Sequence, residues 1–418
     1  MQKDYLEKVF GPGGLIARFH DKYEYRAGQV AMAEAVAKAF EEKRHLLVEA
    51  GTGTGKTLAY LIPAISASIG KKKRIVISTG TKNLQEQLME KDVPFLQKVL
   101  PGKFTAAYMK GRSNYACLYR IHKAGSQPIL DGLDQLGHFD RVARWSRETS
   151  TGDRRELVDL PEDLSFWSRI NAKGETCIRM RANADAADII VVNHHLFFAD
   201  LSVRGNQFGK VIPDYSAVIF DEAHLIEDIA ADYFGFQVSN FQVDELARDA
   251  ATLPLTDANA TREIDRIASK IAGLSDQFWI RFTDARFDGR FPLYLEAFAQ
   301  RTTSGETQPT PLGEACYALD AALKRLESSV AEFSETVPEA DSLVRRTRQA
   351  RFDLDFVTTQ AEKNYVYWLE KRGKGMFLRA SPVDVSELLR EKLFEKVETC
   401  ILTSATLSSN GKFDFIRD

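Results

Sequence analysis

Five short runs of nearly continuous apolar residues recur along the chain, and each ends in small or polar residues. They are 45–53 (HLLVEAGTG), 74–81 (RIVISTGT), 188–195 (DIIVVNHH), 217–224 (AVIFDEAH) and 399–406 (TCILTSAT). Val, Ile and Leu without polar alternation indicate strands buried on both faces, as in a parallel sheet. Helical patterns follow several runs, for example at 57–69. The pattern predicts an α/β fold with its site at the carboxyl ends of the strands.

Two long regions interrupt this pattern. Residues 111–184 hold few strand signals but many arginines and aromatic side chains, and residues 236–365 are mostly helical in pattern. In the second region apolar residues recur at helical spacing, at Leu319, Leu323, Leu326, Val330 and Phe333. The strand pattern returns near residue 366. We therefore predict one α/β domain, made of 1–110, 185–235 and 366–418, that carries two insertions.

Composition narrows the class of protein. The 418 residues are 44% hydrophobic and 28% charged, which is typical of a globular protein of two or three domains. The net charge is −3, so any attraction to nucleic acid has to come from local basic patches. The charged amino-terminal segment is unlike a signal peptide, and no run is long and apolar enough to span a bilayer. We expect a soluble, cytoplasmic protein without membrane partners.

The segment 48–60, VEAGTGTGKTLAY, has the pattern of a phosphate-binding loop between a strand and a helix. Glycines let the backbone fold around phosphates, and the start of the helix adds a positive end. Lys56 is expected to reach the β- and γ-phosphates of ATP, and Thr57 to hold Mg²⁺. A plain glycine-rich turn is the alternative, but the complete Gly-Lys-Thr run favours a nucleotide. The predicted nucleotide-binding residues of the loop are Ala50, Gly51, Thr52, Gly53, Thr54, Gly55, Lys56 and Thr57.

A nucleotide site also needs a carboxylate element, and the run at 217–224 provides one. Asp221 is predicted to bind Mg²⁺ through water, and Glu222 to orient and deprotonate the attacking water. His224 completes the sequence DEAH and joins the predicted catalytic set with Lys56. Two carboxylates that cap a helix are the alternative, and the loop upstream argues against it.

These motifs occur in an order that resembles superfamily 2 helicases. The flanking segments resemble the XPD/DinG family of DNA helicases and its bacterial members. The resemblance covers most of the chain and is weak across the helical insertion. It rests on the loop, on DEAH, and on the segments 78–88 (STGTKNLQEQL), 110–120 (KGRSNYACLYR), 187–201 (ADIIVVNHHLFFADL), 378–389 (LRASPVDVSELL) and 402–407 (LTSATL).

The resemblance implies a RecA-like P-loop domain and a role for several further residues. Arg26 and Gln29 resemble the element that reads adenine. Residues 404–406 resemble the element that couples the state of ATP to the grip on DNA. The insertion at 111–184 resembles an iron–sulfur domain, and 236–365 resembles a helical arch over single-stranded DNA. The segment that contacts single-stranded DNA in the family corresponds here to Thr79, Thr81 and Gln85.

The residues themselves suggest a further DNA contact in the first insertion. Arg112 could follow the phosphates of a single strand, and Tyr115 could stack on its bases. Ordinary surface arginine and core tyrosine are an equally good interpretation. His194 and His195 follow a strand without a nearby cluster of metal ligands, so we predict a polar strand tip near the DNA path.

The cysteines depart from the family pattern. A [4Fe–4S] cluster takes four thiolates, and only Cys117 and Cys177 match the expected positions. Two explanations stay open: the cluster has been lost, or a short stretch between Cys177 and Ile178 is missing from this sequence. Retention of the first two cysteines favours the second explanation. A cluster is therefore a possible cofactor beside ATP and Mg²⁺.

A helicase of this type has two RecA-like domains with ATP between them, and the second supplies arginines to the transferring phosphoryl group. We find no second sheet pattern or late arginine motif after Thr406, so we expect the chain alone to hydrolyse ATP very slowly. The resemblance implies an ATP-dependent DNA helicase with 5′→3′ polarity that acts on single-stranded or forked DNA. The alternatives are a P-loop ATPase acting on RNA or protein complexes, and a nucleotide-sensing DNA-binding module without motor activity.

Overall fold

The computed structural model divides into two compact units, formed by residues 1–229 with 386–418 and by residues 230–385. No helix of the described residues combines the length and apolar character that crossing a membrane requires. The structure describes residues 2–20, 22–69, 73–126, 133–149, 151–161, 164–172, 183–204, 210–282, 287–301, 306–408 and 412–414.

A six-stranded parallel sheet, in the order β1-β12-β5-β2-β4-β3, forms the centre of the first unit. Each of the five predicted apolar runs contains one of its strands, so the predicted parallel α/β sheet is confirmed. The strands are β1 (Leu46–Glu49), β2 (Ile75–Thr79), β3 (Ala106–Tyr108), β4 (Ile189–Asn193), β5 (Ala217–Asp221) and β12 (Thr399–Ser404). Because all pairs are parallel, the loops after β1, β2, β5 and β12 leave the sheet at one edge.

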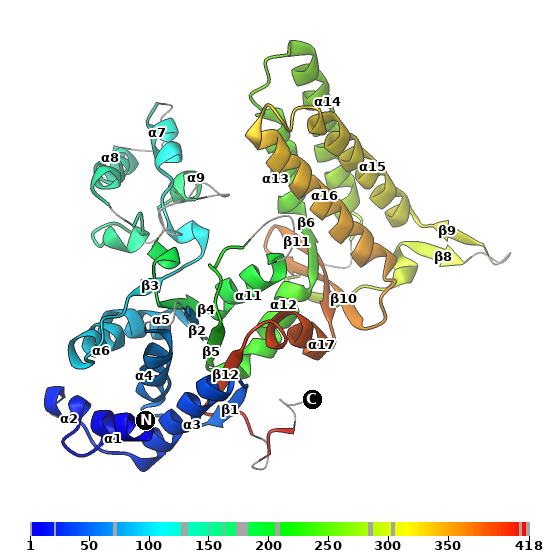
Figure 1. Ribbon diagram of the computed structural model, residues 1–418. Coiled ribbons are helices and arrows are strands. Elements are labelled where there is room, and N and C mark those ends of the chain that lie inside the picture. Colours follow the sequence, from blue (N-terminus) through cyan, green and yellow to red (C-terminus); the bar gives the residue numbers. More distant parts are fainter. Residues whose placement is uncertain are drawn as a thin grey trace. The chain divides into compact units, whose positions relative to one another are not determined.

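Helices flank this sheet, as Figure 1 shows. Helix α4 is buried over most of its surface, because apolar residues occupy nearly every position from Ala59 to Ile65. A helix that is apolar all round belongs in a core, and α4 directly follows the glycine-rich loop. Outside the first insertion, the described helices that begin in the first unit are α1 (Gln2–Phe10), α2 (Leu15–Phe19), α3 (Ala27–Glu42), α4 (Lys56–Ser68), α5 (Lys82–Gln87), α6 (Val93–Val99), α11 (His194–Val203), α12 (Ile226–Phe234) and α17 (Ser386–Leu389).

The described part of the first insertion has a small hydrophobic core of its own. The helices α7 (Leu118–Ser126), α8 (Leu133–Glu148) and α9 (Trp167–Ile170) contribute most of it. Phe139 and Phe166 meet edge to face at 5.7 Å between ring centroids. The aromatic side chains of this region therefore serve packing at these positions.

The second unit combines four long helices with a four-stranded antiparallel sheet in the order β6-β11-β10-β7. The predicted apolar positions of 319–330 are buried and line the helical core. The helices are α13 (Asn240–Ala251), α14 (Ala258–Trp279), α15 (Pro311–Ala331) and α16 (Pro338–Thr359). The strands are β6 (Phe236–Ser239), β7 (Gly289–Pro292), β10 (Tyr365–Arg372) and β11 (Gly375–Pro382), with a separate pair β8 (Ala299–Arg301) and β9 (Thr307–Pro309).

One predicted boundary differs from the structure. Residues 366–382 do not return to the parallel sheet, because β10 and β11 pair with each other and with β6 and β7. The chain re-enters the first unit at Ser386, and β12 is the strand that completes its sheet. The boundary predicted near 366 therefore moves to 386.

A cluster of arginines on α16 is neutralised by carboxylates within the second unit. Arg346 contacts Asp249 at 2.7 Å, and Arg351 lies 2.7 Å from Asp320 and 2.9 Å from Glu327. Such pairs tie α16 to α13 and α15 at the helix surfaces. They leave less free positive charge than the sequence suggests.

Asp353 on α16 makes the stability of the second unit depend on pH. Its side chain is 7% exposed and accepts a hydrogen bond from Gln349 at 2.7 Å. Burial raises the pKa of Asp353 from 3.8 to about 7. Between those two values the native state binds more protons than the unfolded chain, so the free energy of unfolding falls as pH rises through that window. We expect Asp353→Asn to gain stability over the wild type by roughly 2 kcal/mol between about pH 5 and pH 8.

Hydrogen exchange of the α15 and α16 amides, compared between variant and wild type at each pH, measures this difference for the second unit itself. Asp355→Asn is the matched control, since Asp355 is exposed on the same helix. If the difference in free energy of unfolding between Asp353→Asn and the wild type does not change with pH, the Asp353 carboxyl is already ionised in the folded protein.

Candidate nucleotide site

The loop between β1 and α4 has the backbone conformation that its glycines permit. Gly53 and Gly55 have φ angles of +77° and +79°, which side-chain-bearing residues rarely adopt. A Cβ on Gly55 would also stand 2.1 Å from the Gln29 amide nitrogen. Around Gly53, in contrast, nothing lies within 4 Å of a Cβ position. The loop is therefore packed against Gln29 at Gly55. It is open at Gly53, where a ligand can approach the backbone.

Lys56 is the first residue of α4 and faces the acidic end of β5. Its side chain is 10% exposed, and its Nζ lies 3.5 Å from Glu222 Oε1. Among the described residues, no acceptor makes a hydrogen bond to this buried Nζ. A buried ammonium with unused donors is costly, and a phosphate oxygen would satisfy it. The environment of Lys56 thus fits the triphosphate that the sequence predicts.

Asp221, the last residue of β5, lies beside the same helix. It is 5% exposed, Tyr60 donates to its Oδ2 at 3.0 Å, and the Glu222 N–H donates to its Oδ1 at 3.1 Å. Burial raises the pKa of the Asp221 carboxyl, and the Tyr60 hydrogen bond works against that rise. A cation in front of this carboxylate would favour its charged form. The chemistry of Asp221 and Thr57 fits Mg²⁺, which prefers oxygen ligands.

Glu222 is held in an unusual conformation. Its φ is +61°, in the left-handed region that non-glycine residues seldom occupy. Ser404 on β12 donates to Glu222 Oε2 at 3.2 Å, and Ser404 Oγ lies 2.8 Å from His224 Nδ1. The predicted catalytic residues Lys56, Glu222 and His224 are thus brought together with Ser404.

Two residues of this site went unnoticed in the sequence. Glu49 accepts the backbone N–H of Leu407 at 2.7 Å and that of Ser408 at 2.5 Å, which ties the segment after β12 to the start of the loop. These hydrogen bonds, that from Ser408 first, lower the pKa of Glu49. Gly80 lies so close to the DEAH segment that a Cβ there would stand 2.7 Å from Leu225 Cδ1. The sequence did contain a signal for Glu49, because it is an acidic residue at the end of an apolar strand.

Arg26 and Gln29 both contact the loop itself. Gln29 is 4% exposed and donates to the Gly55 carbonyl at 2.9 Å, and Arg26 donates to the Gly53 carbonyl. Both side chains therefore lie beside the loop that is predicted to bind nucleotide. Recognition of adenine by either side chain stays a prediction.

Three of the predicted DNA contacts are buried, which does not fit a surface role. Thr79 is 0% exposed, and Gln85 is 1% exposed and donates to the carbonyls of Met109 at 2.8 Å and Val191 at 3.2 Å. Tyr115 is 4% exposed, and its hydroxyl accepts from the Lys110 N–H at 3.2 Å. These side chains join backbone segments of the unit, so base contacts by Gln85 and Tyr115 would require rearrangement.

The other two predicted DNA contacts, Thr81 and Arg112, stay predictions. Thr81 is exposed, and its hydroxyl caps α5 by accepting from the Leu84 N–H at 3.3 Å. Of Arg112 the structure describes only the backbone of a short turn. His194, predicted in a polar strand tip, is instead fully buried, with Nδ1 2.7 Å from Ser78 Oγ. Burial lowers the pKa of His194 to about 4, so it is neutral at pH 7.

The cysteines do not supply an iron–sulfur site. Cys117 is buried, and Cys177 lies outside the described residues. Cys316 is buried in α15 and Cys400 is buried in β12, so neither belongs to the first insertion. In the described ranges, no three His, Cys, Asp or Glu residues are grouped to hold a metal ion. Four thiolates are needed, and the sequence has two in this region, so the residues present do not fit a [4Fe–4S] cluster.

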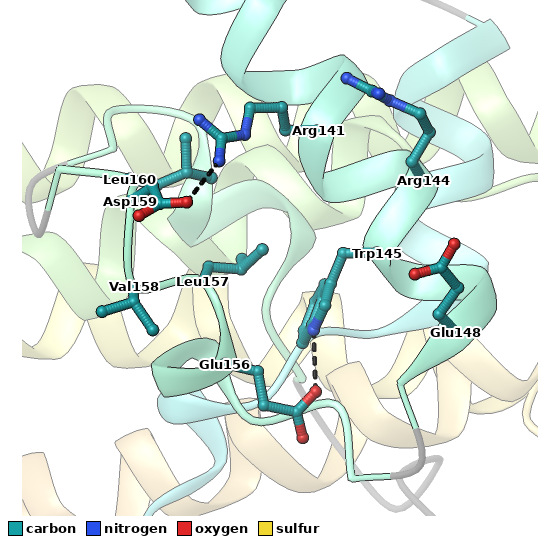
Figure 2. A pocket seen from close by; sticks show the side chains of 9 residues that line it. All are labelled: Arg141, Arg144, Trp145, Glu148, Glu156, Leu157, Val158, Asp159 and Leu160. Atoms are coloured by element: carbon teal, nitrogen blue, oxygen red, sulfur yellow. Dashed lines mark hydrogen bonds and ion pairs between the residues drawn. The ribbon is translucent and has the colours of Figure 1, made fainter.

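A surface hollow of about 390 Å³ lies elsewhere, between α8 and residues 156–160 (Figure 2). Trp145 donates to Glu156 at 2.8 Å and Arg141 donates to Asp159 at 2.8 Å across it. Its polar groups are thereby largely paired with one another. None of its lining residues belongs to the loop or the DEAH segment, so it is separate from the nucleotide chemistry.

Comparison with known proteins identifies two helicase families along the chain. The DEAD/DEAH box helicase family matches residues 30–127, and the DEAD_2 family matches residues 104–243. Similar proteins include the ATP-dependent DNA helicase YoaA of Haemophilus influenzae, 32% identical over 98% of this chain and 64% of that protein. YoaA of Escherichia coli is 34% identical over 96% of this chain and 63% of that protein.

The ATP-dependent helicase DinG of Mycobacterium tuberculosis is 31% identical over 93% of this chain and 60% of its own length. The chain thus spans less than two thirds of each of these relatives. A solved structure described as an XPD helicase is similar with a TM-score of 0.44 and 13% identity, over 92% of this chain and 59% of that one.

Proposed function

We propose that the chain is a member of the XPD/DinG family of helicases and forms the nucleotide-binding part of an ATP-dependent DNA helicase, as its similarity to the YoaA proteins and to the DEAD/DEAH box model supports. The observation that carries this proposal is the meeting of two motifs that lie far apart in sequence. Lys56 after β1 and Glu222 after β5 approach to 3.5 Å, with Asp221 and Tyr60 beside them. An ammonium without a hydrogen-bond acceptor, opposite the buried Asp221 and the half-buried Glu222, is the arrangement that a magnesium-bound triphosphate would complete.

Each residue then has a part in phosphoryl transfer. Lys56 binds the β- and γ-phosphates, and the loop N–H groups bind them from the side of Gly53. Thr57 and Asp221 would hold Mg²⁺, which when bound neutralises charge on the phosphates. Glu222 orients the attacking water and accepts its proton. His224 and Ser404 hold Glu222 and connect it to the segment after β12.

The same proposal gives each part of the fold a role in the helicase. The parallel sheet of the first unit is the first RecA-like domain, and a second RecA-like domain completes the motor in the whole protein. Residues 111–184 correspond to the iron–sulfur domain of the family by position, without a cluster assigned to them. The helical unit corresponds to the arch. In the whole protein, opening and closing around ATP would move single-stranded DNA and separate a forked duplex.

The test is nucleotide binding by this chain, followed by the response of its ATPase to nucleic acids. We expect ADP to bind more tightly with Mg²⁺ than with EDTA, by calorimetry. Any slow ATP hydrolysis should rise with single-stranded DNA and less with RNA. Stronger stimulation by RNA would favour the RNA-directed ATPase, and failure to bind nucleotide would refute the proposal.

A further inference from the structure

A tyrosine lies beneath the two residues assigned to magnesium. Tyr60 is on α4, one turn after Lys56 and three residues after Thr57, so it shares a helix face with both. Its side chain is 0% exposed, and its hydroxyl donates to Asp221 Oδ2 at 3.0 Å. One buried hydroxyl therefore links α4, the helix that carries Thr57, to Asp221 at the end of β5.

The hydroxyl is suited to act as a donor. A tyrosine hydroxyl carries a proton that it can donate, and here the acceptor is a carboxylate oxygen. Asp221 accepts from the Tyr60 hydroxyl on Oδ2 and from the Glu222 N–H on Oδ1. Two donors on opposite oxygens fix the plane of the carboxylate. A carboxylate that is 5% exposed cannot replace a lost donor with bulk water at little cost.

We propose that Tyr60 is a positioning residue for magnesium-nucleotide binding, whose hydroxyl holds Asp221 in the orientation that faces one Mg²⁺. This inference rests on the proposed nucleotide-binding function. Tyr60 itself does not touch the nucleotide or the ion, and its effect passes through Asp221, the ligand that it contacts. Groups that orient metal ligands in this way commonly change metal affinity by about 10- to 100-fold when they are removed.

Tyr60→Phe tests the proposal, because it removes the hydroxyl and keeps the buried ring. ADP affinity is measured by calorimetry with Mg²⁺ and with EDTA. We expect the gain in ADP affinity that Mg²⁺ provides to fall by about 10-fold, while affinity in EDTA stays within about twofold. Tyr367→Phe is the matched control, since the Tyr367 hydroxyl donates to the Glu362 carbonyl at 2.9 Å within the second unit. That control should leave both affinities unchanged.

A double-mutant cycle separates this role from a general loss of structure. Asp221→Asn is combined with Tyr60→Phe, and the Mg²⁺-dependent gain is measured for all four proteins. If Tyr60 acts through Asp221, the second substitution adds little to the first. Fully additive losses, or equal losses in Mg²⁺ and EDTA, would overturn the proposal.

The outcomes also distinguish this inference from the function on which it rests. A wild type whose ADP binding is indifferent to Mg²⁺ would refute the proposed function and this inference with it. A wild type that responds to Mg²⁺, beside a Tyr60→Phe protein that responds equally, would leave the nucleotide site standing and refute the role of Tyr60 alone.

Discussion

Lys56→Met is expected to weaken the binding of magnesium-bound ADP by about 100-fold, since it removes the charged donor that reaches the phosphates. Methionine keeps much of the buried stem, so the loss comes mainly from the ammonium. In the empty site the half-buried Glu222 carboxylate also loses the ammonium that lies 3.5 Å away. Calorimetric titration with ADP and Mg²⁺ measures the change directly.

Lys38→Met is the matched control for this substitution. Lys38 also faces a glutamate, Glu42 at 3.7 Å, but on the exposed surface of α3. We expect its ADP affinity to equal that of the wild type. An unchanged affinity in the Lys56 variant would mean that nucleotide, if bound at all, does not place its phosphates in this loop.

The core of the first unit and the position of the candidate nucleotide site could be predicted from local sequence pattern. Continuous apolar runs identified the buried strands, and parallel strands release their following loops at one edge of a sheet. The loop ending at Lys56 and the acidic pair at 221–222 therefore had to lie at that edge. The observed 3.5 Å between Lys56 and Glu222 agrees with that reasoning.

The apolar pattern alone could not predict which of the two sheets a strand joins. The pattern assigns residues 366–382 to the α/β domain, yet they lie in the antiparallel hairpin of β10 and β11 in the second unit. One signal was present in the sequence: Gly373 and Lys374 separate the two strands as a two-residue loop, in which Gly373 has a φ of +56°. A glycine at the first position of such a loop is typical of an antiparallel hairpin. The three-residue β3 gave too short a pattern for prediction.

The direction of individual side chains was the least predictable property. Gln85 follows the second strand, as a DNA-contacting residue could, but its amide bonds carbonyls at Met109 and Val191. Those partners are 24 and 106 residues away in sequence, and no local sequence pattern predicts such contacts. Tyr115 is likewise placed by the core of the insertion. The Tyr60 contact with Asp221 has the same character, because it spans 161 residues.

Glu222→Gln should have the opposite signature to Lys56→Met, with binding retained and hydrolysis lost. Glutamine keeps the size of the side chain but cannot accept the proton of the attacking water. Loss of a positioned general base lowers the rate by roughly 10²- to 10⁴-fold. Binding should not weaken, because Lys56 is freed from the carboxylate that lies 3.5 Å away and can turn fully to phosphate. Single-turnover hydrolysis of labelled ATP, with protein in excess, detects even the slow rate expected of this chain.

Glu227→Gln provides the comparison, since Glu227 is exposed and lies at the start of α12, just beyond the DEAH segment. It should hydrolyse ATP at the wild-type rate. A Glu222→Gln protein that keeps that rate would place the base elsewhere. One that loses ADP affinity as well would show that the Lys56–Glu222 contact maintains the loop rather than competing with phosphate. Retained affinity together with lost turnover would leave Glu222 as the group that activates water, held in its left-handed conformation between Lys56 and Ser404.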